Sequence, residues 1–328
     1  MQLEAAKILI IRLGAIGDVV HTMNTYRAIK AKYPNVKIHY MTTKTQACFL
    51  EHDDEIDKVW IVDKNDLKIA KSQKLAKLLK VENYDLVINL QPNFKSRFLC
   101  LFAGIKHQSI YKKTFKLHAV ENFFQTAKKY YKDIELPQNM KLKISEDAKL
   151  YAKNELKKLA RPIIAFNAGG IISPRQGRTY PVDNWYKLGE LINQEVGGTI
   201  LLTGSNVDYE FLKPLEHLPN VVSYIGKTTL EQNAAIIGCC DLMISGDSGP
   251  LHIATALNVP SIGLYGSMPI NRTGTYGENA ISLKSDMSCV PCNRRKCKFL
   301  KGTKNIYAPC MSKISVENIL LEVKKFLN

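Results

Sequence analysis

Short apolar runs alternate with helical patterns along most of this chain, and that alternation constrains the fold more than any other feature. Residues 7–13 form a nearly continuous apolar run, as in strands that are covered on both faces. Apolar side chains then recur every three or four positions from Val20 to Tyr33, which predicts an amphipathic helix. Strands alternating with helices build parallel βαβ units, so we expect an α/β fold. Further strands are expected at residues 36–41, 58–62, 85–90, 163–166, 199–202, 221–224, 241–244 and 260–265.

The strand–helix pattern restarts near the middle of the chain. A chain of 328 residues is long enough for two domains of ordinary size. A helix that begins at Ser145 ends shortly before Arg161–Pro162, where the next strand pattern follows. We therefore expect two Rossmann-like domains, over residues 1–160 and 161–312, and a C-terminal helix over residues 313–328.

The net charge of +16 is large for a chain of this size. It favours an acidic partner, namely an anionic membrane surface, a nucleic acid or a phosphorylated substrate. The denser basic zone from Lys106 to Arg161 lacks the interleaved aromatic residues of a single-strand binder. No apolar run approaches the length of a membrane span, and the first residues lack the layout of a signal peptide. We therefore expect a cytoplasmic protein.

Four glycine-marked loops follow expected strands, at the place where α/β sheets bind their ligands. Glycine lets a ligand approach the backbone, and a helix start offers N–H groups and a positive dipole end to an anion. The loops cover residues 14–18, 167–170, 203–208 and 245–252. None contains the G-x-G-x-x-G or Gly-Lys-Ser/Thr pattern, which weakens the alternative of a dinucleotide oxidoreductase. Together they suggest a nucleotide-type ligand on the second half and an acceptor on the first.

The loop Ser-Gly-Asp-Ser-Gly-Pro-Leu-His over residues 245–252 joins an expected buried strand to an expected helix. Asp247 would project from the carboxyl end of that strand. Asp and Ser are also common helix caps, so capping and ligand binding remain alternative and compatible roles for Asp247 and Ser248.

Several segments of the chain resemble the bacterial heptosyltransferases of glycosyltransferase family 9, which transfer heptose from an ADP-sugar onto the inner core of lipopolysaccharide. Residues 245–266 are similar to the family's Asp-Ser/Thr-Gly-x-x-His signature and the strand after it. Residues 8–18 resemble its strand and Gly-Asp opening, and Ile225–Leu230 resembles its Gly-Lys-Thr-x-Leu segment. Residues 92–105 are similar to the second heptosyltransferase type.

The resemblance implies a GT-B fold, in which two Rossmann-like domains with parallel sheets face each other across a cleft. The first domain would bind the acceptor and the second the nucleotide sugar, and the last helix would pack back on the first domain. It implies an inverting transfer from ADP-heptose to the lipopolysaccharide or lipooligosaccharide core, with no cofactor required for catalysis. The enzyme would be peripheral on an anionic membrane surface, at the inner face of the inner membrane, and no nucleic acid is expected as a partner.

The resemblance also assigns individual residues. Asp18 matches the general base that acts on the acceptor hydroxyl, and Gly14, Gly17 and Lys95 are the expected acceptor contacts. Arg178 stands where the family usually has a lysine, which keeps the charge but not the geometry. The expected donor contacts are Asp247, Ser248, Gly249, His252, Arg178, Gly169, Gly170, Asp208, Lys227 and Thr228.

Four cysteines are grouped near the C-terminus, at positions 289, 292, 297 and 310. Grouped cysteines in a cytosolic protein favour a metal over disulfides, and four thiolates could hold a structural zinc. The spacing is irregular for zinc. The alternative therefore remains that four reduced thiols stand at Cys289, Cys292, Cys297 and Cys310.

Two alternative functions stay open. One is the same fold with another nucleotide sugar or acceptor. The other is a zinc-containing, basic nucleic-acid-binding protein, which would leave the loops of Asp18 and Asp247 unexplained and would bind nucleic acid with a strong salt dependence.

Overall fold

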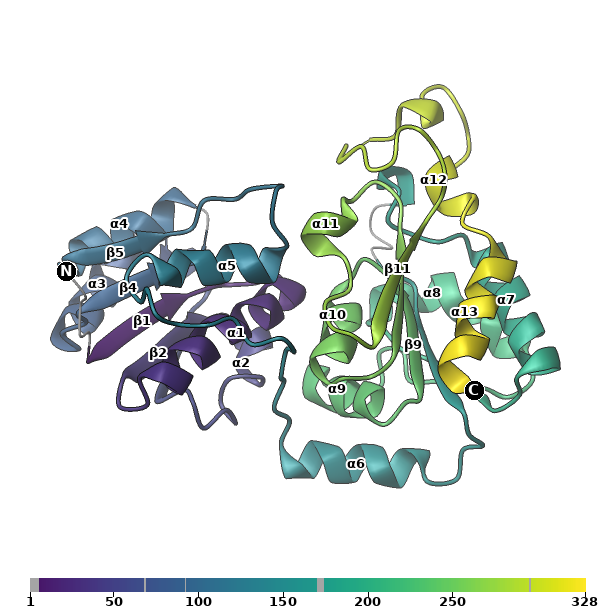
Figure 1. Ribbon diagram of the computed structural model, residues 1–328, viewed down its shortest axis with the longest axis horizontal. Helices are drawn as coiled ribbons and strands as arrows, with labels where there is room; N and C mark the ends of the chain where they lie inside the picture. Colours follow the sequence, from purple (N-terminus) through teal and green to yellow (C-terminus); the bar gives the residue numbers. More distant parts are fainter. Residues whose placement is uncertain (1–5, 68, 92, 170–173, 295) are drawn as a thin grey trace. The chain divides into compact units, whose positions relative to one another are not determined.

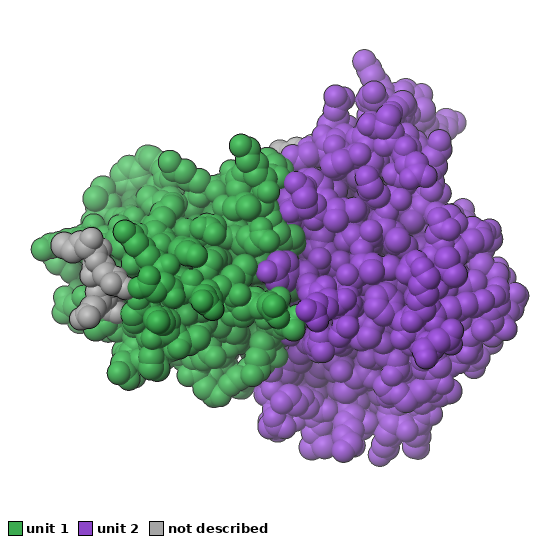
Figure 2. All heavy atoms as spheres, viewed as in Figure 1, with its two compact units in different colours: residues 1–143 green, residues 144–328 purple. Residues whose placement is uncertain are grey.

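The computed structural model describes residues 6–328 except 68, 92, 170–173 and 295. The chain forms two compact units, Met1–Lys143 and Ile144–Asn328 (Figure 2). Each unit is built on its own parallel sheet, so the predicted α/β fold is confirmed. No helix in the described part of the chain is long and apolar enough to cross a membrane.

The first unit holds a five-stranded parallel sheet in the order β3-β2-β1-β4-β5 (Figure 1). Its strands are β1 (Lys7–Ile11), β2 (Lys37–Thr42), β3 (Lys58–Ile61), β4 (Leu86–Asn89) and β5 (His107–Ile110). The helices α1 (Ile16–Lys32) and α5 (Ala119–Lys128) pack together, as do α3 (Ile69–Val81) and α4 (Phe94–Phe102), so each pair covers one face of the sheet. The short α2 (Lys44–Ala47) follows β2. Ile8 to Ile11 of the central strand are fully buried, as their apolar run predicts.

The second unit holds a six-stranded parallel sheet in the order β11-β10-β9-β6-β7-β8. Its strands are β6 (Ile163–Asn167), β7 (Thr199–Leu202), β8 (Val221–Ser223), β9 (Leu242–Gly246), β10 (Ser261–Tyr265) and β11 (Ala280–Lys284). Its helices are α6 (Glu146–Leu156), α7 (Val182–Glu195), α8 (Tyr209–Leu212), α9 (Leu230–Gly238), α10 (Gly249–Ala256), α11 (Ile270–Thr273), α12 (Pro309–Ser312) and α13 (Val316–Leu327). Strands β6 and β9, at the centre of the sheet, are fully buried, and their side chains form much of the core.

The division between the units falls near residue 143 rather than at the expected residue 160. The reason is that α6 packs against α9 of the second unit. The backbone N–H of Ser145 donates to Glu231, and the Tyr224 hydroxyl donates to Glu155 at 3.0 Å. Helix α6 therefore belongs with the sheet that follows it.

The C-terminal helix α13 packs against α7 and belongs to the second unit. That residues 313–328 also pack back on the first domain stays a prediction. Ile319 and Val323 on the inner face of α13 are fully buried in the same core as Trp185 of α7. Its apolar stripe is thus satisfied within the second unit.

Candidate functional site

Each sheet contains one point at which the strand order reverses, which we call its switch point. In the first unit it lies between β1 and β4, and in the second between β6 and β9. Ligands of open α/β sheets bind outside the carboxyl ends of the strands at such points, because the loops on either side turn away from each other. The predicted site residues Asp18 and Asp247 both follow strands that flank these points.

The first switch point opens into a hollow of about 1190 Å³. It is lined by the loops that follow β1, β2, β3 and β4, among them residues 13–15, 43–46, 61–65 and 91–95 with gaps. The described lining includes the predicted acceptor contacts Gly14 and Lys95, but neither Gly17 nor Asp18. Gly14 has φ +124°, and a Cβ there would lie 3.2 Å from the Gln46 side chain, so the glycine is needed for the turn. Gly17 is buried in the first turn of α1.

Asp18 is held by a buried arginine beside this hollow. Its carboxylate accepts a hydrogen bond from Nη2 of Arg12 and another from the backbone N–H of Ala15 at 3.3 Å. Arg12 in turn donates from Nη1 to the Leu90 carbonyl at 2.7 Å, across the switch point, and stacks over Phe123 at 5.2 Å. The Arg12 side chain is 7% exposed, whereas that of Asp18 is 32% exposed. The pair therefore presents its carboxylate outward, at the positive end of α1.

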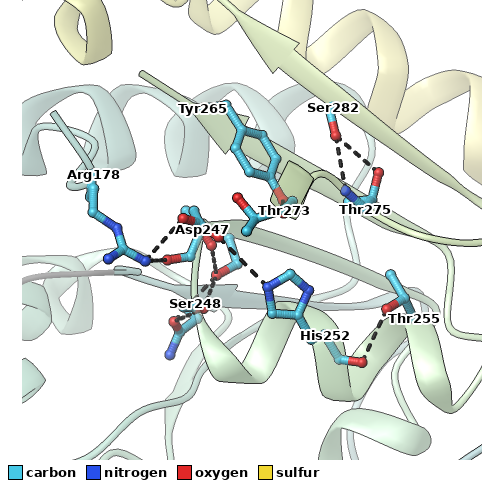
Figure 3. A network of polar contacts seen from close by, with 12 residues as sticks. Arg178, Asp247, Ser248, His252, Thr255, Tyr265, Thr273, Thr275 and Ser282 are labelled. Carbon is cyan, nitrogen blue, oxygen red and sulfur yellow. Dashed lines mark hydrogen bonds and ion pairs between the residues drawn. The ribbon is translucent and has the colours of Figure 1, made fainter. Parts of the chain in front are cut away.

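A second arginine–carboxylate pair lies at the other switch point (Figure 3). Nη2 of Arg178 donates at 2.9 Å both to the carboxylate and to the main-chain oxygen of Asp247. Nε2 of His252 lies 3.6 Å from the other carboxylate oxygen. Here the exposure is reversed, because the Asp247 side chain is 5% exposed and that of Arg178 is 34% exposed. Burial raises the pKa of the nearby Tyr265 hydroxyl well above its usual value, and the negative charge of Asp247 raises it further.

Ser248 occupies the cap position of α10, yet its hydroxyl does not bond to the helix. It lies 2.9 Å from the Ser245 hydroxyl and donates to Oδ1 of Asn167 at 3.2 Å, while Asn167 donates to the Thr203 carbonyl at 2.9 Å. This network joins the ends of β6, β7 and β9. The first N–H groups of an α-helix have no partner within the helix, so the start of α10 keeps donors that this side chain does not cap. Gly249 begins the helix there.

Gly169 and Gly246 let three backbone segments meet at the same place. Gly169 has φ +77°, and a Cβ on it would lie 2.7 Å from Cα of Gly246 and 3.2 Å from the Arg178 carbonyl. The Gly169 N–H donates to Oδ1 of Asn167 at 3.0 Å, so this donor is already engaged inside the protein. Gly169 thus has a packing role, because a larger residue would not fit between these backbone segments. Gly170, the neighbouring predicted contact, lies outside the described residues.

The remaining predicted donor contacts lie on the loops after β7 and β8, which touch through a hydrogen bond from Gly226 to Gly204 at 3.1 Å. Asp208 is buried and accepts from both the N–H and the hydroxyl of Ser205, each at 2.7 Å. Burial raises the pKa of Asp208, and the two bonds from Ser205 oppose that rise. Lys227 is exposed and donates to the Ser223 carbonyl at 2.8 Å, and Thr228 is half-buried beside it.

The four C-terminal cysteines line one small cavity, and all are free thiols. Burial, with a smaller contribution from the other three thiols, raises the pKa of Cys310 to about 11. Thiolates are the ligands that zinc prefers, so the chemistry of the set fits. The arrangement of the four cysteines does not fit a metal ion, because no three His, Cys, Asp or Glu side chains among the described residues are placed to hold one.

The same cysteine segment supports the loop that carries Arg178. The Cys297 N–H donates to the Arg175 carbonyl at 3.0 Å, and the Arg175 guanidinium donates to the Leu300 carbonyl at 2.6 Å. A Cβ on Gly177 would lie 2.7 Å from Sγ of Cys310. The segment therefore fixes the backbone next to Arg178.

Sequence reasoning missed the roles of Arg12, Asn167 and Ser245. Arg12 stands within a strand-like apolar run, where a charged residue is seldom buried unless it is paired, and this was a usable signal. Asn167 is the last residue of β6 and Ser245 the last but one of β9, and the two are partners in the sheet register. That pairing depends on which strands are neighbours, which the sequence does not display.

Comparison with known proteins agrees with this geometry. Residues 72–302 match glycosyltransferase family 9 (heptosyltransferase). The chain is 27% identical over 292 residues to lipopolysaccharide heptosyltransferase 2 of Escherichia coli (strain K12), covering 79% of this chain and 82% of that protein. It is 28% identical over 312 residues to lipooligosaccharide heptosyltransferase 2 of Haemophilus ducreyi, covering 85% and 88%. The solved structure of E. coli ADP-heptose LPS heptosyltransferase II superposes with a TM-score of 0.80 over 98% of both chains, at 24% identity.

Two parallel α/β units of this kind, with that structural match, define the GT-B fold. Because the family match covers more than half of its length, the chain belongs to glycosyltransferase family 9, the heptosyltransferase family. The predicted family, fold and enzyme class are confirmed, and the alternative of a nucleic-acid-binding protein loses its support.

Proposed function

We propose that this enzyme transfers heptose from ADP-heptose to the inner core of lipopolysaccharide or lipooligosaccharide, with inversion at the anomeric carbon. Family membership and the relatives described above support the heptosyl transfer and the choice of donor and acceptor. The observation that carries the assignment of roles is the opposite exposure of the two arginine–carboxylate pairs. The first unit offers a carboxylate outward, and the second offers a guanidinium.

The second unit is the proposed donor site. The outward part of Arg178 and the first N–H groups of α10, next to Ser248 and Gly249, would bind the diphosphate, since both favour an anion. Asp247 and His252 would face the sugar. The guanidinium that now pairs with Asp247 would share its charge with the diphosphate when the donor binds.

The loops after β7 and β8 are the proposed nucleoside side of that site. Lys227 and Thr228 are exposed enough to contact the adenine. Ser205 already donates both hydrogen bonds to one carboxylate oxygen of Asp208. Only the other oxygen could accept a hydrogen bond from the ribose. We therefore propose that Asp208 mainly holds the shape of its own loop.

The first unit is the proposed acceptor site. Its hollow is large enough for several sugar rings, and Lys44 and Lys95 on its wall suit the phosphate and carboxylate groups of a core oligosaccharide. Asp18 would take the proton from the acceptor hydroxyl as that oxygen attacks the anomeric carbon. Arg12 keeps the carboxylate in one position before and after the proton transfer.

The chemical step is one in-line displacement. The acceptor oxygen bonds to the anomeric carbon while the bond from that carbon to the β-phosphate oxygen breaks. The proton moves to Asp18, and ADP leaves with its new charge stabilised by Arg178 and the start of α10. A single displacement inverts the configuration. No cofactor takes part, and the reaction would occur at the cytoplasmic face of the inner membrane, where the core glycolipid is assembled.

We do not propose a zinc ion on the four C-terminal thiols, because their arrangement does not fit a metal ion. The cysteine segment contacts the backbone next to Arg178 through its own hydrogen bonds. Metal analysis of the purified enzyme tests the absence of zinc separately from activity.

The decisive experiment is transfer from ADP-heptose to a defined core acceptor, with the anomeric configuration of the product determined by NMR. We expect product with inverted configuration from the wild type and a severe loss with Asp18→Asn and with Asp247→Ala. If ADP-heptose is neither bound nor consumed with any core acceptor, the proposal fails. A panel of other nucleotide sugars then identifies the donor.

A further inference from the structure

Helix α4 of the first unit has two apolar faces, and one of them is uncovered. Its inner face, with Leu99 and Cys100, is fully buried beside the sheet. Its outer face carries Phe94, Phe98, Leu101 and Phe102, at helical spacings of four, three and one. Phe94, Leu101 and Phe102 are 69%, 65% and 46% exposed. An ordinary surface helix is polar on that side, so these four residues, which we call the α4 ridge, form an unusual surface.

The ridge is continuous. The rings of Phe94 and Phe98 lie 4.2 Å apart between centroids, and those of Phe98 and Phe102 lie 5.8 Å apart. Figure 1 shows α4 beside α3 in the helical layer on one face of the first sheet. The aromatic side chains therefore form one continuous row along the whole helix.

The charge around the ridge has one sign. Residues 86–120, which contain α4, include six lysines and arginines and no aspartate or glutamate. Lys95 and Arg97 are exposed on α4 itself, and Lys106 is exposed just after it. The loop after β5 adds the exposed Lys112 and Lys116, and it leaves the same edge of the sheet as the start of α4, because β5 pairs with β4. The surface thus combines exposed aromatic residues with concentrated positive charge.

The ridge begins at the rim of the hollow in the first unit. Phe94 and Lys95, the first two residues of α4, are part of the wall of that hollow. Ile61, on another side of the same wall, is about half exposed. An acceptor sugar in the hollow would therefore lie next to the ridge.

We propose that the α4 ridge docks this enzyme on an anionic lipid bilayer. Aromatic and leucine side chains of an amphipathic helix enter the boundary between head groups and acyl chains, and nearby lysines and arginines bind anionic head groups. A second copy of the chain is a poorer occupant, because it would bring the same positive charges against these. The inference rests on the proposed function only in explaining why the hollow opens beside the ridge, since a core acceptor is anchored by its lipid.

The test is co-sedimentation of the full-length enzyme with vesicles, without donor or acceptor. Vesicles of phosphatidylethanolamine with phosphatidylglycerol are compared with vesicles of phosphatidylcholine. We expect binding to the anionic vesicles that weakens as salt is added. The variant Leu101→Ser/Phe102→Ser should lower the partition coefficient by about tenfold or more, because it removes two side chains from the apolar contact. Neither residue belongs to the proposed catalytic or binding machinery.

A matched control comes from the second unit. Leu150 and Leu321 are each more than half exposed, on α6 and α13, so Leu150→Ser/Leu321→Ser removes a similar exposed apolar area elsewhere. This control should bind vesicles like the wild type. Arg97→Gln/Lys106→Gln should weaken binding to anionic vesicles and leave the ridge intact. Thermal unfolding of each variant checks that it is folded.

The proposal is overturned if the ridge variant binds anionic vesicles as well as the wild type does, or if the control loses as much binding. It is also overturned if the wild type binds no vesicles and instead forms a dimer that the ridge variant abolishes in sedimentation velocity. Transfer to a water-soluble, deacylated core acceptor separates this proposal from the proposed function. The ridge variant should keep that activity, whereas failure of the wild type to use ADP-heptose would overturn the function and leave the vesicle result standing.

Discussion

The two switch points contain the same pair of residue types in opposite orientation. In the first unit Arg12 is buried and Asp18 faces outward, whereas in the second Asp247 is buried and Arg178 faces outward. A buried charge must be paired, so in each case the inner partner holds the outer one in place. The outer partner is then the group available to a ligand. A carboxylate suits a hydroxyl that must lose its proton, and a guanidinium suits a phosphate.

The surroundings of the two pairs also differ, and each suits the ligand that its outer residue suits. The first switch point opens into a hollow lined by four loops. At the second, Asn167 of β6 already bonds with Ser245 and Ser248, which lie at the end of β9 and just after it. A preorganised network suits a ligand part that is the same in every reaction, such as a diphosphate, because the groups need little rearrangement. An open hollow suits a large acceptor.

The largest effect is expected from Asp18→Asn, which keeps the shape of the side chain but removes the proton acceptor. We expect the turnover number to fall by about 10²- to 10⁴-fold. The Michaelis constant for ADP-heptose should stay nearly unchanged, because we propose that the donor binds to the other pair. Steady-state kinetics with a core acceptor measures both. Full turnover in this variant would remove Asp18 from the role of general base.

Arg178→Gln should act on the donor instead. A hydrogen bond to a charged group contributes about 1.5–3 kcal/mol, so we expect ADP to bind roughly tenfold to a hundredfold more weakly. Arg178→Lys should recover part of the loss, because it restores the charge without the two-pronged geometry. Isothermal titration with ADP measures these affinities. Equal ADP binding by all three proteins would show that the outward guanidinium does not contact the diphosphate.

A smaller effect is expected from Gly177→Ala, which tests whether the cysteine segment positions Arg178. Gly177 has φ +69°, and the new methyl group would meet Sγ of Cys310 at 2.7 Å. Holding alanine in this conformation costs about 1–3 kcal/mol, so the midpoint of thermal unfolding should fall. ADP affinity should fall severalfold as the neighbouring Arg178 shifts. Gly104→Ala, at another positive φ in the first unit with open space around it, should lower stability without changing ADP affinity.

The smallest effect is expected from Asp208→Asn. If Asp208 holds its own loop, the dissociation constant for ADP should change by less than about threefold, which is within the free energy of one neutral hydrogen bond. Because the folded-state pKa of Asp208 is raised above its unfolded value of 3.8, this group stabilises the fold most below that pH. Its contribution is lost as the pH rises through the folded-state pKa.

The stability of Asp208→Asn relative to the wild type should therefore increase as the pH rises from about 4, because asparagine does not ionise. Urea unfolding at a series of pH values measures the difference. A large loss of ADP affinity in this variant would instead support a direct contact with the ribose.

Much of the fold was predictable because central parallel strands are covered on both faces. The strands β1, β4, β6 and β9 have short apolar runs and lie where such runs were expected. The edge strands β5 and β11 were not predicted. They pair on one side only and have mixed sequences, His-Gln-Ser-Ile and Ala-Ile-Ser-Leu-Lys, which resemble loops.

The site was predictable in part. Asp18, Arg178 and Asp247 were singled out through the resemblance, but the partnership of Asp18 with Arg12 was not. Such a pair depends on the exact end of β1 and on the direction of one side chain, and sequence spacing carries neither. The two bonds that Asp208 accepts from Ser205 were also not predicted, and its contact with the ribose stays a prediction.

The division of labour between the two pairs is tested most directly by measuring ADP-heptose binding to Asp18→Asn and Asp247→Asn by calorimetry. We predict that Asp18→Asn binds the donor with the wild-type dissociation constant, and that Asp247→Asn binds it at least about tenfold more weakly, as expected for a lost charged hydrogen bond. Equal weakening by both substitutions, or weakening by Asp18→Asn alone, would contradict the account.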